Sequence, residues 1–379
     1  MAVERVLIVG GGIAGLATAA GLTRAGVECV VVESATAWRP IGAGIILNAN
    51  AMAALHMLGL AEGVASRGLR LGEGAITDQR GRDMARTNFR ALDAEFGPTI
   101  SVHRAELHAA LLEGASTAKI FLGTSVERID QQPNGVKALL TDGREEYFDL
   151  VIGADGLHSR VREMTFGCIP PVYAGYTCWR FVTKATLPQS RMCEMWGRGK
   201  RFGVVPLSQE QFYVFAVANA APGATDHEQK NLKKIRCLFG DFGGPAPALL
   251  EALEAPNEVI CNDLYSVPVG NWFEGHVVLI GDAAHAMTPN MGQGAGMGLE
   301  DAAVLVDELL QQCPVSDALS NYRVRREDRV TWVHNQSRRI GEIAQVENAM
   351  ACQARNAIIK VIPNCASNRA LRKLVSQPI

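Results

Sequence analysis

The sequence of 379 residues predicts an α/β fold that combines an open, mostly parallel sheet with an antiparallel sheet and C-terminal helices. Two observations carry this prediction. Apolar runs rich in β-branched residues occupy 6–9, 150–152 and 277–280, and each ends at a glycine, as is typical of buried parallel strands. Residues 173–218 alternate between apolar and polar side chains, which indicates an antiparallel sheet with one face on the core.

The first apolar run opens a glycine-rich turn of the G-x-G-x-x-G pattern, which predicts a Rossmann-like domain. Gly10, Gly12 and Gly15 have the spacing that a tight turn, the approach of a pyrophosphate and close helix packing require. The phosphates would lie at the helix N-terminus, beside Ala14, because free N–H groups and the helix dipole favour anions there. Glu33 closes the next apolar run, where a carboxylate binds ribose hydroxyls and disfavours a 2′-phosphate. We therefore expect FAD or NAD here; a glycine-rich turn without a ligand is the alternative.

The third apolar run favours FAD over NAD. Asp282 emerges at its C-terminal end, the edge at which open α/β sheets bind ligands, and is placed to hold ribityl hydroxyls. Gly292, Gly294 and Ala295 then lead into a long apolar-periodic helix, so a second helix N-terminus points at a site near Asp282. Such a terminus would stabilise the negative charge of a reduced flavin. A surface aspartate after a strand is the alternative.

Together, these segments resemble the single-component flavoprotein aromatic hydroxylases, which have the para-hydroxybenzoate hydroxylase fold. The match runs from Val6 to about Arg338. The resemblance implies that Arg104 contacts the FAD phosphate or ribityl region, that Asp155-Gly156 serves both FAD and NAD(P)H, and that Val126 lies at the cofactor. It implies no second nucleotide-binding domain, so NADH or NADPH would dock transiently as a co-substrate.

The reaction that the resemblance implies is hydroxylation of an aromatic or heteroaromatic ring by NAD(P)H and O2, through a flavin C4a-hydroperoxide. Candidate catalytic residues come from the antiparallel sheet, and they are Arg180, Arg201 and Tyr213. Arginine can hold an anionic or enolic substrate, and tyrosine can donate or shuttle a proton. In the urate hydroxylase branch, an Arg and a Tyr at this spacing act at the substrate, matching Arg201 and Tyr213. A plain surface position on the sheet is the alternative for each residue.

The substrate is less well defined than the reaction. The urate branch has Asp after a Thr-Pro pair, whereas Asn290 follows Thr288-Pro289 here. Residues 39–42, 177–180, 199–201 and 286–290 resemble the 2-alkyl-4-quinolone 3-monooxygenase branch. We therefore expect a quinolone-like or other bicyclic heteroaromatic substrate. A urate-, salicylate- or hydroxynicotinate-type hydroxylase is the alternative, and a flavin reductase or halogenase-like enzyme on the same scaffold is a further one.

Composition excludes several other classes of protein. The net charge of −2 offers no basic field for nucleic acid, and no apolar run approaches 18 residues. Nine cysteines without a CxxC pair or a Cys/His cluster indicate reduced thiols and no metal site. We expect a cytoplasmic monomer or homodimer that takes a small aromatic substrate and O2, without stable membrane insertion. A basic C-terminal helix is expected to pack on the core rather than touch a membrane.

The expected domain organisation is discontinuous. The FAD-binding domain is predicted to comprise residues 1–75, 101–171 and 269–315. Residues 76–100 would add strands to a substrate layer, residues 172–268 would form the substrate domain with its antiparallel sheet, and residues 316–379 would be C-terminal helices. The polar stretch from Ile76 to Pro98 is expected to form strands and turns.

Overall fold

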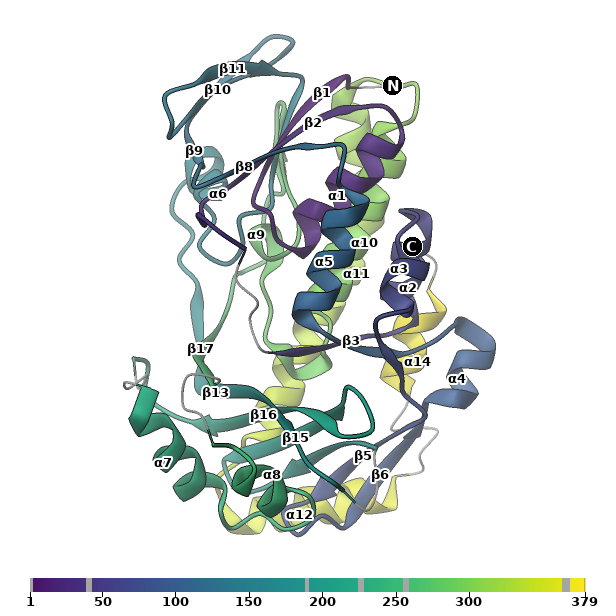
Figure 1. The fold of residues 1–379 in the computed structure, drawn as a ribbon, viewed down its shortest axis with the longest axis vertical. Coiled ribbons are helices and arrows are strands. Elements are labelled where there is room, and N and C mark those ends of the chain that lie inside the picture. The colour runs from purple at the N-terminus through teal and green to yellow at the C-terminus, as the bar shows by residue number, and fades with distance from the viewer. Residues whose placement is uncertain are drawn as a thin grey trace.

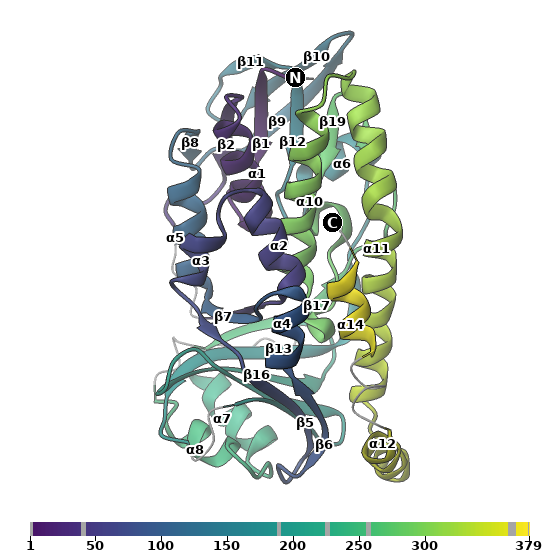
Figure 2. The ribbon, with the colours of Figure 1, turned by 90° about the vertical axis from the view of Figure 1, so that its right-hand side faces the viewer.

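The structure is a computed structural model that describes residues 3–38, 43–187, 191–223, 228–254, 259–362, 369–377 and 379. The chain has the predicted α/β architecture. Figures 1 and 2 show an elongated molecule with one sheet toward each end and a long helix spanning the distance between them. Both sheets are built from segments that are distant in the sequence, and the domain boundaries given above stay a prediction.

A six-stranded sheet with the order β18-β19-β12-β1-β2-β8 lies toward one end (Figure 1). Its strands are β1 (Arg5–Val9), β2 (Glu28–Glu33), β8 (Lys119–Leu122), β12 (Leu150–Gly153), β18 (Phe273–Glu274) and β19 (Val277–Leu279). Every neighbouring pair is parallel except β18 and β19. The strands predicted from the three apolar runs, β1, β12 and β19, are neighbours and are buried along nearly their whole length. Their carboxyl ends therefore meet at one edge of the sheet.

Helices cover this sheet and connect it to the rest of the molecule. They are α1 (Ile13–Arg24), α2 (Ala49–Met57), α3 (Ala61–Ala65), α5 (Arg104–Gly114), α6 (Arg160–Phe166), α9 (Asp282–His285), the 3-10 turn η2 (Pro289–Met291), α10 (Gly294–Leu309), α11 (Val315–Ala344), α12 (Ala349–Val361) and α14 (Arg369–Ser376). Helix α10 packs against both α1 and α11, so it links the six-stranded sheet to the long helix. No helix in the described ranges is long and apolar enough to cross a membrane.

A seven-stranded sheet with the order β17-β13-β16-β15-β14-β5-β6 lies toward the other end. Its strands are β5 (Glu73–Asp78), β6 (Asp83–Asn88), β13 (Val172–Lys184), β14 (Met192–Trp196), β15 (Lys200–Pro206), β16 (Gln211–Asn219) and β17 (Ile260–Ser266). All neighbours are antiparallel except β14 and β5. One face buries Trp179, Phe202 and Phe212 in a cluster with α7 (Glu228–Phe239) and α8 (Ala246–Glu251). Because side chains alternate along a strand, Arg180, Arg201 and Tyr213 occupy the opposite face.

Two three-stranded sheets complete the described strands. One sheet is a meander of β9 (Val126–Gln132), β10 (Gly135–Leu140) and β11 (Glu145–Phe148). The other sheet consists of β3 (Gly44–Leu47), β4 (Leu69–Arg70) and β7 (Ile100–His103). Strand β3 reaches the seven-stranded sheet, since a Cβ on Gly44 would lie 2.5 Å from Cβ of Tyr213.

The expectation that residues 76–98 form only strands and turns is wrong. Helix α4 (Phe89–Phe96) follows β6. Asn88 begins the helix by accepting a hydrogen bond from the N–H of Ala91, and Phe89 and Leu92 bury their side chains one turn apart. This two-turn helix has too short a periodic pattern to stand out from the polar sequence around it.

Candidate functional site

Three turns meet at the carboxyl edge of the six-stranded sheet. Strand β1 leads into Gly10, β12 into Ala154, and β19 into Gly281. A Cβ on Gly10 would lie 2.4 Å from the carbonyl oxygen of Ala154, and a Cβ on Gly281 would lie 3.1 Å from Cβ of Ala14. The segments that the sequence singled out separately therefore form one structure.

The glycines of the first turn have different physical roles. Gly10 has φ of 111°, and a Cβ on Gly15 would lie 2.0 Å from the carbonyl oxygen of Gly10, so the turn itself requires both glycines. A Cβ on Gly12 would meet no heavy atom within 4 Å. This open space lies at the N-terminus of α1, which has no side-chain cap and no acidic residue in its first turn. Backbone N–H groups facing an open cradle fit a pyrophosphate.

Glu33 lies beside this cradle at the end of β2. Its Oε2 accepts a hydrogen bond of 2.9 Å from the N–H of Gly11, and its Oε1 accepts one of 2.8 Å from the N–H of Ala35. A carboxylate has about four acceptor positions, so Glu33 keeps capacity for ribose hydroxyls. Nε2 of His108 lies 2.9 Å from the carbonyl oxygen of Gly11, and the rings of His108 and Trp38 are 4.8 Å apart. The sequence did not single out His108 or Trp38, because both depend on tertiary contacts with the turn.

The third turn is held by hydrogen bonds to Asp301 of α10. Asp301 accepts hydrogen bonds from the N–H of Gly281, at 2.9 Å, and from Nε2 of His285, at 2.5 Å. These bonds hold the turn on which Asp282 stands. Oδ1 of Asp282 lies 4.0 Å from the position of a Cβ on Gly294, where α10 begins without a side-chain cap. Gly292, Gly294 and Ala295 thus lie around a second helix N-terminus next to Asp282, which fits the negatively charged end of a reduced flavin.

Arg104, Asp282 and Tyr213 lie near one another, and none of these three side chains has a hydrogen-bond partner among the described residues. Arg104 and Asp282 keep exposed surface although protein atoms surround them, which is the situation of residues that line an opening. Burial lowers the pKa of Arg104, as does the neighbouring Arg180, whereas Asp282 and Tyr213 act to raise it. Burial raises the pKa of Asp282 above its usual value. Unpaired polar groups in such a space indicate a ligand site.

Tyr213 faces this opening from the seven-stranded sheet. Burial raises the pKa of its hydroxyl above the ordinary value, although Arg180 and Arg104 act in the opposite direction. The group therefore stays protonated at neutral pH and can donate a hydrogen bond. Its ring centroid is 6.0 Å from that of Phe215, which is half-buried on the same face. This part of the sheet offers an aromatic surface with one hydroxyl donor.

Arg201 has a different environment from Tyr213. It is 2% exposed and donates to Gln345, Glu194 and Asn290 at 3.0, 3.0 and 2.7 Å. These bonds use three of its five N–H groups. Tyr213 pairs with Val205, four residues along β15 from Arg201, so the two positions are about 13 Å apart along the strand at the usual rise per residue. The structure places both residues on one face but does not bring their side chains together.

The remaining predicted site residues lie as follows. Arg180 donates to Oδ1 of Asn262, and its buried Nε has no partner in the part of the chain that the structure describes. Asp155 accepts hydrogen bonds from backbone N–H groups at the start of α6, and Gly156 beside it has φ of 80°. Val126 is fully buried in the core, so only its backbone could reach a ligand. The string at residues 39–42 lies outside the described residues.

An ion network between α10 and α11 was not predicted. Arg326 binds Glu300 and lies 2.8 Å from Oδ1 of Asp301, while Arg329 lies 2.6 Å from Oε2 of Glu300. All four side chains are buried, and they join α10 to α11. Their spacing of 25 to 29 residues exceeds any local pattern, so the sequence carries no direct signal for it.

A parallel sheet whose edge carries a glycine cradle and two open helix N-termini is the fold and site of a dinucleotide-binding flavoprotein. A family model described as an FAD binding domain matches residues 4–337 of the chain. The chain belongs to this family, among the FAD-dependent aromatic hydroxylases.

Similar proteins support this membership. The aurachin C monooxygenase/isomerase of Stigmatella aurantiaca is 39% identical over 362 residues, which cover 94% of each chain. The 2-heptyl-3-hydroxy-4(1H)-quinolone synthase of Pseudomonas aeruginosa is 34% identical over 372 residues, which cover 97% of each. The structure of Klebsiella pneumoniae HpxO with FAD and uric acid superposes with a TM-score of 0.91 at 26% identity, over 98% of this chain and 96% of that chain. The predicted fold, the FAD cofactor and the monooxygenase class are confirmed.

Proposed function

We propose that the chain hydroxylates a bicyclic heteroaromatic ring of the 2-alkyl-4-quinolone kind, with NADH or NADPH and O2 as co-substrates. Two similar proteins carry names from quinolone or aurachin chemistry. The observation in this chain that carries the proposal is the environment of Arg201. Glu194 neutralises its charge at 3.0 Å, and the neutral amide of Asn290 holds it. To bind an anionic substrate, Arg201 would need a positive charge that no carboxylate already neutralises, whereas an uncharged ring needs no such charge.

Tyr213 and Arg180 would act on the ring. The protonated hydroxyl of Tyr213 would donate a hydrogen bond to the ring oxygen. Arg180 would stabilise the negative charge that develops on this oxygen as the ring loses a proton, because a guanidinium is effective in a water-poor site. Both interactions stabilise the deprotonated ring, and it is the loss of the proton that raises the electron density of the ring carbon that is hydroxylated. Phe215 would pack against the ring.

The cofactor would be held by the edge of the six-stranded sheet. The cradle at Gly12 would bind the pyrophosphate, Glu33 the adenosine ribose, and Arg104 and Asp282 the phosphate or ribityl part. When bound, FAD supplies the redox chemistry, which no side chain of the chain can provide. The residues of the chain orient it and keep water away from the ring.

Oxidation of NADH and NADPH by the purified yellow protein tests this proposal. The panel contains 2-heptyl-4-quinolone, urate, salicylate and hydroxynicotinate, with product mass measured for each. We expect the quinolone alone to stimulate oxidation more than about tenfold and to give a product heavier by one oxygen. Stimulation by urate or a carboxylate instead would overturn the substrate class and leave the hydroxylase class intact.

We also propose a cytoplasmic enzyme that acts as a monomer or homodimer. The cysteines at positions 29, 168, 178, 193, 237, 261, 313 and 352 are free thiols, which fits a reducing compartment. Light scattering of the FAD-loaded protein measures its mass in solution, and a tetramer would contradict this proposal.

A further inference from the structure

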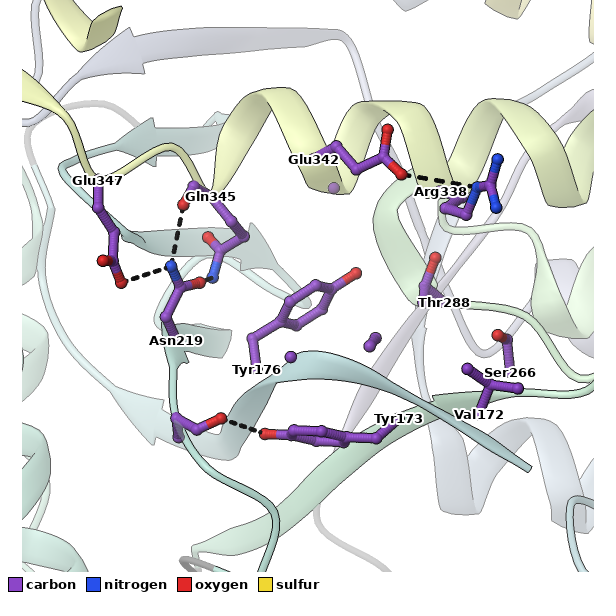
Figure 3. Close-up of a pocket in the computed structure, with 14 residues that line it drawn as sticks. Val172, Tyr173, Tyr176, Asn219, Ser266, Thr288, Arg338, Glu342, Gln345 and Glu347 are labelled. Carbon is purple, nitrogen blue, oxygen red and sulfur yellow. Dashed lines mark hydrogen bonds and ion pairs between the residues drawn. The ribbon is translucent and has the colours of Figure 1, made fainter. Parts of the chain in front are cut away.

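A second cavity lies between the end of the seven-stranded sheet and α11 (Figure 3). Its volume is about 820 Å³, which is within the range of small-molecule sites. The segment of β13 that lines the cavity departs from regular pairing with β17 between Tyr173 and Thr177, and Gly175 within it has φ of 89°. Residues of α11 line the cavity as well.

Hydrogen-bond donors line this cavity. The hydroxyl oxygen of Tyr176 accepts a bond of 2.9 Å from Nδ2 of Asn290, so its own proton has no acceptor in that pair and is free to donate. Ser266 offers a second hydroxyl, which has no hydrogen-bond partner among the described residues. Arg338 stands at the rim, where its nearest carboxylate, that of Glu342, is 3.6 Å away and largely exposed. Such a loose ion pair leaves the guanidinium available to a ligand.

The rest of the lining combines an aromatic and apolar wall with polar side chains. Tyr173 lies flat along one wall, held by a hydrogen bond of 2.8 Å from its hydroxyl to the carbonyl oxygen of Ala220 (Figure 3). The polar side chains that line the cavity are Asn219, Thr288, Gln345, Glu342 and Glu347. Hydrogen-bond donors and acceptors beside an aromatic wall fit a planar ring that bears both a carbonyl group and an N–H.

The side chain of Tyr176 lies at the boundary between this cavity and the face of the seven-stranded sheet that carries Tyr213. Tyr176 is 5% exposed and belongs to a small apolar cluster with Cys178, Val217 and Phe215, which lie on the face that carries Tyr213. A Cβ on Gly341 would lie 2.7 Å from the hydroxyl of Tyr176, so glycine at this position allows the ring of Tyr176 to pack against α11.

We propose that this cavity is a second binding site for a planar heteroaromatic ketone, the chemical class of the proposed substrate and of its hydroxylated product. The inference rests on the proposed function for the class of ligand, and on Tyr176, Ser266 and Arg338 for the site. A molecule bound there touches Tyr176, which lies on the face of the sheet that carries Tyr213, so the cavity serves as a waiting position for the substrate or the product.

Calorimetric titration of the FAD-loaded enzyme under anaerobic conditions tests this inference. The probes are 2-heptyl-4-quinolone and, separately, its 3-hydroxylated product. We expect two binding events per chain for at least one probe, and the probe that shows them identifies the molecule that waits. Ala220→Trp fills the cavity and should leave one event, with FAD content and turnover at saturating substrate unchanged. Val172→Trp fills the same space from β13 and should do the same if Ala220→Trp folds poorly.

The control is Ala221→Trp, because Ala221 is exposed and does not line the cavity. This variant should retain both events. A single event in the wild type, together with turnover of the quinolone, would overturn this inference alone. Two events that survive in both filled variants would overturn it as well. Absence of both binding and turnover would overturn the proposed substrate class together with the inference.

Discussion

Gly12 and Gly15 are three residues apart, yet one position is enclosed by the protein and the other faces open space. Gly15 is enclosed by the turn, where any side chain would collide with the backbone of Gly10 at 2.0 Å. Gly12 faces open space, so only a ligand can need it to be glycine. The difference separates a residue that the fold requires from one that, in the proposed site, the cofactor would require.

Gly12→Val should therefore fold but lose the cofactor. Its backbone has φ of −79°, which valine adopts, and its side chain would occupy the cradle. We expect the purified variant to be nearly colourless, with far-UV circular dichroism like that of the wild-type apoprotein. Gly270→Val is the control, because Gly270 also has free space around it but lies in an exposed loop. Full FAD content in Gly12→Val would show that the cradle does not bind the pyrophosphate.

Tyr213→Phe tests the proposed donor to the ring. No described residue bonds to this hydroxyl, so its removal should change the free energy of unfolding by less than about 1 kcal/mol. Loss of one donor to developing charge should lower kcat about 10- to 100-fold while FAD content is unchanged. Tyr147→Phe, at an exposed position, should be neutral. Turnover of Tyr213→Phe at the wild-type rate would remove this residue from the mechanism.

At the scale of elements, α10 carries the site and α11 holds α10 in place. Glu300 and Asp301 lie two turns after the start of α10 at Gly294, and both are fully buried against Arg326 of α11. Asp301 passes this restraint to the third turn through the N–H of Gly281. The geometry around Asp282 therefore depends on an ion network that does not touch the opening.

Arg326→Met should be strongly destabilising, because it leaves two buried carboxylates short of a cation. The expected loss in the free energy of unfolding is about 3–5 kcal/mol. Arg323→Met is the matched control on the same helix, since Arg323 pairs with Glu327 at the surface, with side chains 36% and 40% exposed. Arg323→Met should lower the free energy of unfolding by less than about 1 kcal/mol. Equal effects of the two substitutions in urea unfolding would contradict a structural role for the network.

Acid should weaken the same network. Burial acts to raise the pKa of Asp301, but His285 and Arg326 outweigh it and hold the pKa at about 2. A carboxyl with a lowered pKa stabilises the fold above its unfolded pKa and loses this contribution as the pH falls through the folded one. The difference in Tm between the wild type and Asp301→Asn should thus be complete above about pH 4 and shrink toward pH 2. A difference that grows on acidification would show that Asp301 is not held as a carboxylate.

The sequence predicted elements with a long periodic pattern or a motif, and missed those that depend on distant partners. The three parallel strands and the antiparallel sheet of residues 173–218 have clear local patterns, and both are present. Helix α4 spans two turns in a polar stretch and was missed. The contact between Arg201 and Asn290 joins residues 89 positions apart, so spacing alone could identify each residue but not their pairing.

At the scale of the whole molecule, two sheets share one site. Figure 2 shows the two sheets toward opposite ends of the molecule. The parallel sheet would supply the dinucleotide cradle, and the antiparallel sheet would supply the aromatic face with Tyr213. The sequence predicted both sheets. The three apolar runs that end in glycine indicated the parallel sheet, and the alternating residues 173–218 indicated the antiparallel sheet. The second cavity could not be predicted, since its walls come from β13, β16, β17 and α11.

Turnover of 2-heptyl-4-quinolone by the FAD-loaded enzyme under 18O2 decides whether the chain hydroxylates this ring, when NAD(P)H consumption and labelled product are measured in the same reaction. We expect one labelled oxygen in the product and nearly one product molecule for each NAD(P)H consumed. Consumption of NAD(P)H that yields only labelled hydrogen peroxide, or a product without the label, would contradict this expectation.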